Sequence, residues 1–264
     1  MLRSVKSLEG FAIGATDGPF GNVKDFYFDD QAWVVRYLVV DTSIWLGGRK
    51  VLVSPYSIGQ PGWDATVLPA AITKEQIKNS PSIDSDEPVS RQFEKSYLGY
   101  YGYPYYWGGP GLWGPGYYPG TTLTGMDAQY IDVYQGYLRA PGADDGDPHL
   151  RSCNAVKGYH LIASDGEIGH IQGFLLDDRT WSIRYLIVNT SNWWVGHQVL
   201  VSPEWIEHVS WTNSEVKVAL DREAIQRAPV YTEGMALDRD AEFGIYNHYG
   251  RNAYWKAARR LDAA

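Results

Sequence analysis

Two pairs of adjacent aspartates are the residues of this sequence whose type and spacing most suggest chemistry. Asp29-Asp30 and Asp177-Asp178 each lie at a turn between apolar segments. Such carboxylates can bind a divalent cation weakly or relay a proton, but adjacent side chains point in different directions and a cation needs further oxygen ligands. The alternative interpretation is that these acids form the turns and neutralise a nearby arginine.

An arginine follows each aspartate pair within an apolar run. A guanidinium in that position needs a partner, because an unpaired buried charge is strongly destabilising. A structural ion pair is therefore expected in each case, and anchoring of a ligand is the other role open to the arginines. The candidates for these ion pairs are Arg36 with Asp29 or Asp30, and Arg184 with Asp177 or Asp178.

Other signatures of catalysis or ligand binding are weak. The six histidines show no ligand spacing, and the single cysteine, Cys153, cannot form a disulfide within one chain. Residues 143–149 resemble part of a calcium loop but lack ligands at alternate positions and the closing glutamate. No nucleophile elbow, zinc-protease motif, phosphate loop or dinucleotide loop occurs. We therefore expect no catalytic, cofactor-binding or metal-binding residue, no cofactor and no enzymatic activity.

An aromatic stretch runs from Tyr97 to Pro119 and reads YLGYYGYPYYWGGPGLWGPGYYP. Its aromatic residues alternate with glycine and proline and carry almost no charge. Such a stretch can pack over its own domain, or it can form a surface that binds a partner, because large exposed aromatic patches promote association. The candidates for a partner surface are Tyr100, Tyr103, Tyr105, Tyr106, Trp107, Trp113, Tyr117 and Tyr118.

The composition bounds the class of protein. The chain has 264 residues, of which 44% are hydrophobic and 20% charged, a balance typical of globular proteins. Its formal charge of −8 argues against nucleic acid or an anionic membrane surface as partner, because both are bound through lysine and arginine. No apolar run approaches the ~18 residues that span a bilayer, and residues 1–6 precede no apolar signal segment. We expect a cytoplasmic protein without a membrane span.

The sequence repeats itself without a gap, since residue n resembles residue n + 148 from residue 3 to residue 107. A repeat of this length indicates two whole domains rather than a solenoid. The predicted boundaries are a first repeat with a helical and aromatic extension (1–107), a linker (108–150), a second repeat with its extension (151–255) and a tail (256–264). The matching groups include Arg36-Tyr37-Leu38 with Arg184-Tyr185-Leu186, and Arg91, Glu94, Tyr106 and Trp107 with Arg239, Glu242, Tyr254 and Trp255.

Each repeat has the pattern of short strands followed by a short helix. Turn signals such as Asp17-Gly18 separate segments rich in aromatic and β-branched residues. Thr73 and Gln76 fit a capping box at the start of a helix, and Asp221 is the corresponding N-cap in the second repeat. The expected strands are 11–15, 21–28, 33–40, 49–53 and 63–68, with 168–176, 181–188, 199–201 and 216–220 in the second repeat.

The segment from Trp33 to Val40 is apolar on both of its faces. A strand with one face in water would alternate cleanly, so one face should fill a barrel and the other should be covered. We expect the sister repeat to provide that cover, with the two repeats related by a pseudo-two-fold axis as in an isologous dimer. The predicted fold is mainly β: two small β-barrels with short terminal helices.

A set of residues in each repeat resembles the PRC-barrel domain, which is named from the cytoplasmic part of the H subunit of the purple-bacterial photosynthetic reaction centre. The resemblance covers about residues 3–80 and 151–228 and includes no catalytic motif. In the first repeat it is carried by Gly14, Asp17-Gly18, Gly21, Val23-Lys24-Asp25, Asp29-Asp30, Arg36 to Asp41, Trp45, and Val51 to Pro55.

The resemblance implies a strongly bent β-barrel that serves protein–protein association. We therefore expect a non-catalytic interaction or assembly module that binds a protein partner or itself, and contact with a membrane complex follows by analogy only. One alternative is a ligand-binding or enzymatic protein with a pocket between the repeats. Another is an accessory to photosynthetic electron transfer, as in the reaction-centre H subunit.

Overall fold

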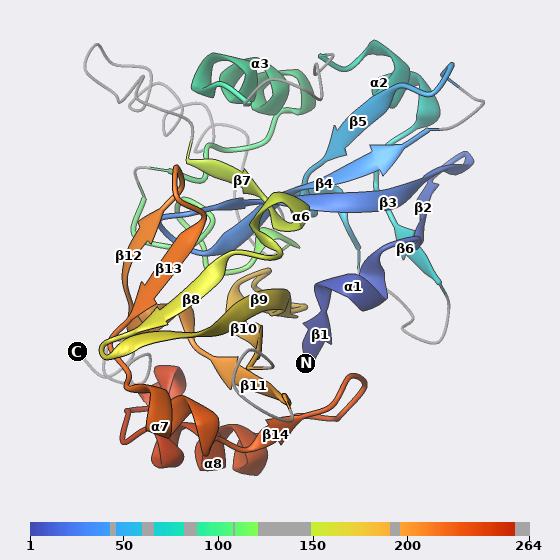
Figure 1. Ribbon diagram of the computed structural model, residues 1–264. Helices are drawn as coiled ribbons and strands as arrows, with labels where there is room; N and C mark the ends of the chain where they lie inside the picture. The colour runs from blue at the N-terminus through green and yellow to red at the C-terminus, as the bar shows by residue number, and fades with distance from the viewer. Residues whose placement is uncertain are drawn as a thin grey trace. The chain divides into compact units, whose positions relative to one another are not determined.

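The computed structural model describes residues 1–42, 46–59, 66–81, 89–107, 109–120, 149–190 and 196–256. Within these ranges the protein is mainly β, with two sheets that each mix parallel and antiparallel pairing (Figure 1). The chain forms two compact units. Unit 1 comprises residues 1–6, 155–177 and 183–264, and unit 2 comprises residues 7–154 and 178–182.

The sheet of unit 2 has the strand order β5-β4-β3-β2-β6, and β7 pairs with β3. Its pairs are antiparallel except for β2 with β6, which is parallel. The strands are β2 (Ala12–Ala15), β3 (Gly18–Asp29), β4 (Val34–Asp41), β5 (Lys50–Val53), β6 (Val67–Pro69) and β7 (Leu150–Ser152). The helices of this part of the chain are η1 (Pro55–Ser57), α2 (Lys74–Asn79) and α3 (Arg91–Tyr101).

The sheet of unit 1 has the order β12-β13-β8-β9-β10-β11-β14, and β1 pairs with β9. Its strands are β1 (Leu2–Ser4), β8 (His160–Ala163), β9 (Gly166–Asp177), β10 (Ile183–Asn189), β11 (Gln198–Val201), β12 (Ile206–Ser210), β13 (Glu215–Val218) and β14 (Val230–Tyr231). Its helices are η3 (Pro203–Trp205), α7 (Arg222–Gln226) and α8 (Arg239–His248).

The first strand of each sequence repeat belongs to the unit that contains the sheet of the other repeat. In unit 1, Leu2 of β1 pairs with Asp177 of β9. In unit 2, Leu150 of β7 pairs with Asp29 of β3, which is the same register at the equivalent positions. The short helices α1 (Val5–Leu8) and α6 (Cys153–Val156) directly follow these two strands. Each sheet is therefore completed by a strand from the beginning of the other repeat.

The turns have equivalent conformations in the two units. Gly18 and Gly166 have φ angles of 118° and 137° at the tips of the first hairpins, a region that glycine enters without strain. Trp33 and Trp181 both adopt positive φ, 53° and 59°, between the two long strands. This conformation is rare for a bulky residue, and it explains why β4 begins at Val34 rather than at Trp33, where the sequence pattern placed it.

Several local predictions are confirmed. The Thr73 side chain accepts a hydrogen bond from the backbone N–H of Gln76, and the Gln76 side chain accepts one from the backbone N–H of Thr73. The capping box at the start of α2 is therefore formed. Asp221 caps α7. Every residue of β4 is buried except Asp41, as its apolar pattern on both faces indicated. Residues 43–45 and 63–65, which include the expected loop tryptophan Trp45 and the start of a predicted strand, lie outside the described residues.

Candidate functional site

A buried carboxylate lies at the centre of unit 2. Glu94 on α3 is completely buried, and its Oε1 accepts from the Tyr106 hydroxyl at 2.5 Å and from the Tyr37 hydroxyl at 3.1 Å. Arg91, one helical turn earlier, donates to Glu94 Oε2 at 2.9 Å and to the Tyr106 hydroxyl at 3.1 Å. Strand β4, helix α3 and the chain after α3 are thus joined through one carboxylate, which we call the Glu94 cluster.

Arg36 borders this cluster and forms the ion pair that the sequence predicted. Its Nη2 lies 3.1 Å from Asp29 Oδ2, and the side chain is 3% exposed. Its Nη1 donates to the Leu112 carbonyl at 2.5 Å, and its guanidinium lies over the Tyr106 ring at 3.9 Å. Two acceptors and an aromatic ring therefore compensate the burial of this charge.

Asp30 has different partners from its neighbour. Its carboxylate accepts from Arg151 Nε at 2.8 Å and lies 3.2 Å from His149 Nδ1. Arg151 belongs to β7, the strand that unit 2 receives from the second repeat. The two adjacent carboxylates of the Asp29-Asp30 turn therefore hold two different segments in place. This agrees with the interpretation that the aspartate pair has a structural role. Within the described residues, no group of three or more His, Cys, Asp or Glu side chains could hold a metal ion.

The equivalent cluster in unit 1 surrounds Glu242 and is looser. Glu242 on α8 is 4% exposed and accepts from the Tyr185 hydroxyl and from Arg239 Nη1, both at 3.4 Å. Arg239 donates to the Tyr254 hydroxyl at 2.8 Å, but its side chain is 58% exposed, against 12% for Arg91. The same residue types therefore meet in both units, but in unit 1 the bonds to the carboxylate are longer and the arginine is more exposed.

Arg184 departs from its counterpart Arg36. Among the described residues no ion pair joins Arg184 to Asp177 or Asp178, so that sequence prediction is wrong. Its guanidinium lies over the Tyr254 ring at 4.1 Å, and its Nε is buried without a hydrogen-bond partner, as the Nε of Arg36 also is. Aspartate and arginine at the same spacing therefore did not produce the same pair in the two units.

The buried hydroxyls of these clusters resist ionisation. Burial, followed by the nearby Glu94 carboxylate, raises the pKa of both Tyr37 and Tyr106 well above the usual value for tyrosine. Burial also raises the pKa of Glu94 itself, against the opposing effects of Arg91 and of the two hydroxyl donors. In unit 1, burial raises the pKa of Tyr254 to about 12. The tyrosine hydroxyls of these clusters are therefore neutral hydrogen-bond donors in the folded protein.

Four of the eight aromatic candidates for a partner surface are buried inside unit 2. Tyr103, Tyr105, Tyr106 and Trp113 are buried, Trp113 completely, so their side chains are not accessible to a partner in this structure. Trp107 and Tyr118 are half-buried. Tyr100 and Tyr117 are exposed, at 41% and 51%. The glycines and prolines between these residues let the chain turn back over strand β4, which explains why so aromatic a stretch can be enclosed.

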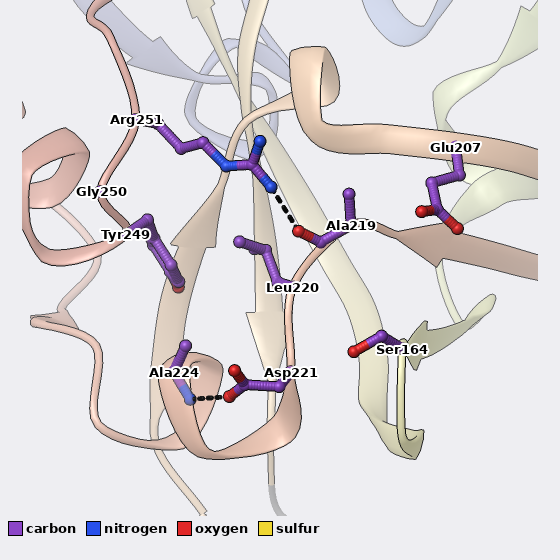
Figure 2. Close-up of a pocket in the computed structure, with 9 residues that line it drawn as sticks. All are labelled: Ser164, Glu207, Ala219, Leu220, Asp221, Ala224, Tyr249, Gly250 and Arg251. Carbon is purple, nitrogen blue, oxygen red and sulfur yellow. Dashed lines mark hydrogen bonds between the residues drawn. The ribbon is translucent and has the colours of Figure 1, made fainter.

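A surface pocket of about 500 Å³ lies within unit 1 (Figure 2). Three of the polar side chains along its wall already have roles in the fold. Figure 2 shows Arg251 donating to the Ala219 carbonyl, and Asp221 accepting from the Ala224 amide at the start of α7. Glu207, another lining residue, forms an exposed ion pair with Lys217 at 3.2 Å. The pocket does not gather convergent unpaired groups of the kind that mark a catalytic site.

Tyr249, which also lines this pocket, has a buried hydroxyl without a hydrogen-bond partner. Its counterpart in unit 2, Tyr101, has the Ser80 hydroxyl beside it, which partly offsets the rise that burial causes in the pKa of Tyr101. Position 228 of the second repeat, equivalent to Ser80, is an alanine that is 5% exposed. The serine hydroxyl that lies beside Tyr101 is therefore missing beside Tyr249.

The Glu94 and Glu242 clusters were not predicted as sites from the sequence. The signal was present, because Arg91, Glu94 and Tyr106 recur with their spacing in the second repeat. Recurrence alone could not show that a helix places the carboxylate against a tyrosine of β4. No model of a known protein family matches the chain, and no curated protein matches it significantly. None of the helices in the described ranges is long and apolar enough to cross a bilayer.

Proposed function

We propose that this protein is a non-catalytic assembly module made of two PRC-type barrels related by a pseudo-two-fold axis, and that its task is to bind another protein or another copy of itself. The resemblance of each repeat to the PRC-barrel domain supports the barrel type, as does the helix-and-aromatic extension that packs on the second strand of the long hairpin in both units. In this proposal the role of the Glu94 and Glu242 clusters is structural, because each joins a helix to a strand.

The observation that carries the proposal is the position of the two first strands. Strand β1 completes the sheet of unit 1 and β7 completes the sheet of unit 2, in the same register at equivalent residues. A sheet that gains a strand from another repeat uses backbone hydrogen bonds for association, which is the physical basis of β-strand addition. A fold completed in this way is suited to assembly.

A second feature of unit 2 supports the pseudo-two-fold relation. Val34 forms an isolated antiparallel bridge with Ser182, which is its own equivalent in the second repeat. Beside this bridge, the Val35 amide donates to the Trp181 carbonyl at 2.8 Å. Pairing of a residue with its own equivalent is what an isologous contact produces.

Sedimentation velocity of the full chain over a wide concentration range, combined with chemical cross-linking in an extract of the source cells, tests this function. We expect either a sedimentation coefficient that rises with concentration or a protein that is reproducibly cross-linked to defined residues of the chain. A chain that remains monomeric at every concentration and cross-links to no protein contradicts the proposal.

A further inference from the structure

We propose that unit 1 carries a docking site for a glycine-flanked, tryptophan-bearing turn of a partner protein, centred on Arg184. This inference rests on the proposed function and names the chemistry of the partner. The site, which we call the open Arg184 site, consists of Arg184, Glu204, Arg239, Tyr254 and Trp255, all within unit 1.

Unit 2 shows in cis what the equivalent site accepts. The segment Gly111 to Gly116 folds into a tight turn, with the Gly111 amide bonded to Gly114 and the Trp113 amide bonded to Gly116, both at 2.8 Å. A side chain on Gly111 would collide with the Gly116 carbonyl, so the turn requires glycine there. The turn places Trp113, completely buried, with its ring 5.0 Å from the Arg36 guanidinium.

Three backbone contacts hold that turn on unit 2. The Leu112 carbonyl accepts from Arg36 at 2.5 Å, and the Trp113 carbonyl accepts from the Tyr56 hydroxyl at 3.2 Å. The Gly114 amide donates to the Tyr106 carbonyl at 3.0 Å. Arg36, Tyr56 and Tyr106 thus recognise the main chain of the turn, while the tryptophan fills the space between them.

Unit 1 presents two of these three groups, Arg184 and Tyr254, and no turn formed by the described residues lies on them. Arg184 lies over Tyr254 as Arg36 lies over Tyr106, at 4.1 Å and 3.9 Å. Among the described residues no hydrogen bond joins the Arg184 guanidinium to an acceptor, whereas Arg36 has acceptors at Nη1 and Nη2; the Nε atom is buried and unpaired in both arginines. Arg184, Tyr254 and Trp255 are half-buried, and Glu204 is exposed at the position that Tyr56 occupies in unit 2. A partly desolvated guanidinium lacking an acceptor favours a ligand that brings one.

The charges around the site select the class of ligand. Glu204 lies close enough to Arg184 to be influenced by its charge, and the buried Glu242 carboxylate adjoins Arg239. An inorganic or lipid phosphate would meet these two carboxylates, whereas a neutral main-chain carbonyl would not be repelled. An apolar ring against Tyr254 and Arg184 would gain stacking and cation–π contact. The ligand is therefore a peptide turn rather than an anion.

Fluorescence anisotropy with two dye-labelled synthetic peptides tests this site on the full chain. One peptide has the sequence of residues 109–120, and its control carries the Trp113→Ala change. We expect saturable binding of the first peptide and none of the second. The Arg184→Ala variant should weaken binding at least about tenfold, because a charged hydrogen bond is lost. The Glu204→Tyr variant, which matches unit 1 to unit 2, should tighten it.

The variants also keep the result interpretable. Arg184→Lys retains the charge but cannot supply the planar guanidinium, so it should weaken binding. An unchanged circular dichroism spectrum would show that this variant is still folded. Binding that is unaffected by both Arg184 variants, or no binding even by Glu204→Tyr, overturns the inference. A chain that self-associates or cross-links to a partner yet ignores the peptide overturns this site and leaves the proposed function standing.

Discussion

The two units contain the same arginine, tyrosine and glutamate types at equivalent positions, and they differ in how completely those groups are satisfied. In unit 2, Glu94 is enclosed and bonded at 2.5–3.1 Å, and Arg36 has both a carboxylate and a carbonyl acceptor. In unit 1, the bonds to Glu242 are 3.4 Å long and Arg184 has no ion pair with the neighbouring aspartates. In unit 2, the segment after the cluster turns back over Arg36.

The same residue pattern therefore gives two different arrangements in the two units. Where the covering turn is present, the pattern is an enclosed set of hydrogen bonds that joins a strand to a helix. Where no described residue covers it, the same pattern leaves a half-buried cation and two aromatic rings at the surface. We infer that unit 2 is the more rigid part and that unit 1 carries the binding surface. Three changes to the chain or its solvent test this difference between the two units.

The largest effect is expected from alkaline pH. Burial raises the pKa of Tyr37 and Tyr106 well above the usual value, and raises that of Tyr254 to about 12. The unfolded chain ionises near pH 10, so these neutral phenols stabilise the fold below that pH, and the stabilisation is lost as the pH rises through their folded values. Phenolate absorbance of Tyr106→Phe and Tyr254→Phe variants should show Tyr254 ionising first. Simultaneous ionisation would contradict the difference between the units.

A smaller loss should follow removal of each buried carboxylate. Glu94→Ala leaves two buried hydroxyls without their acceptor and removes the carboxylate partner of Arg91, and we expect a loss of about 3–5 kcal/mol in unfolding free energy. Glu242→Ala should cost about 1–3 kcal/mol, because Arg239 is largely in water and the bonds are longer. Hydrogen exchange of the β4 and β10 amides measures the two units separately. Equal losses in both variants would show that the clusters are equivalent in strength.

The smallest expected effect is a gain in the stability of unit 1. Ala228→Ser restores the hydroxyl that Ser80 supplies to Tyr101, and it should stabilise unit 1 by about 0.5–1.5 kcal/mol through a bond to the unpaired Tyr249 hydroxyl. Denaturant unfolding of the variant measures this effect. The same substitution in a Tyr249→Phe background is the matched control and should give no gain. If the gain persists there, the missing serine is not the reason that Tyr249 is unpaired.

Local features were predictable where a short stretch of residues determines them. The Thr73–Gln76 capping box, the Asp221 cap and the apolar character of both faces of β4 were all visible in the sequence. The Arg36–Asp29 pair was predictable because the two residues flank one turn. The exchange of first strands was not, because Leu2 pairs equally well by pattern with either long strand. The Glu94 cluster also needed the fold, since α3 brings together residues that are distant along the chain.

The pairing of the first strand tests the account most directly. In a Cys153→Ser background, the variant with Leu2→Cys and Asp177→Cys places two thiols at directly opposite positions of an antiparallel pair, within reach of a disulfide. The control with Leu2→Cys and Asp29→Cys tests pairing within one repeat. We predict that the monomeric first variant forms its disulfide rapidly and that the control does not. A disulfide in the control alone would show that each repeat keeps its own first strand, and would contradict the strand exchange on which the proposed assembly function rests.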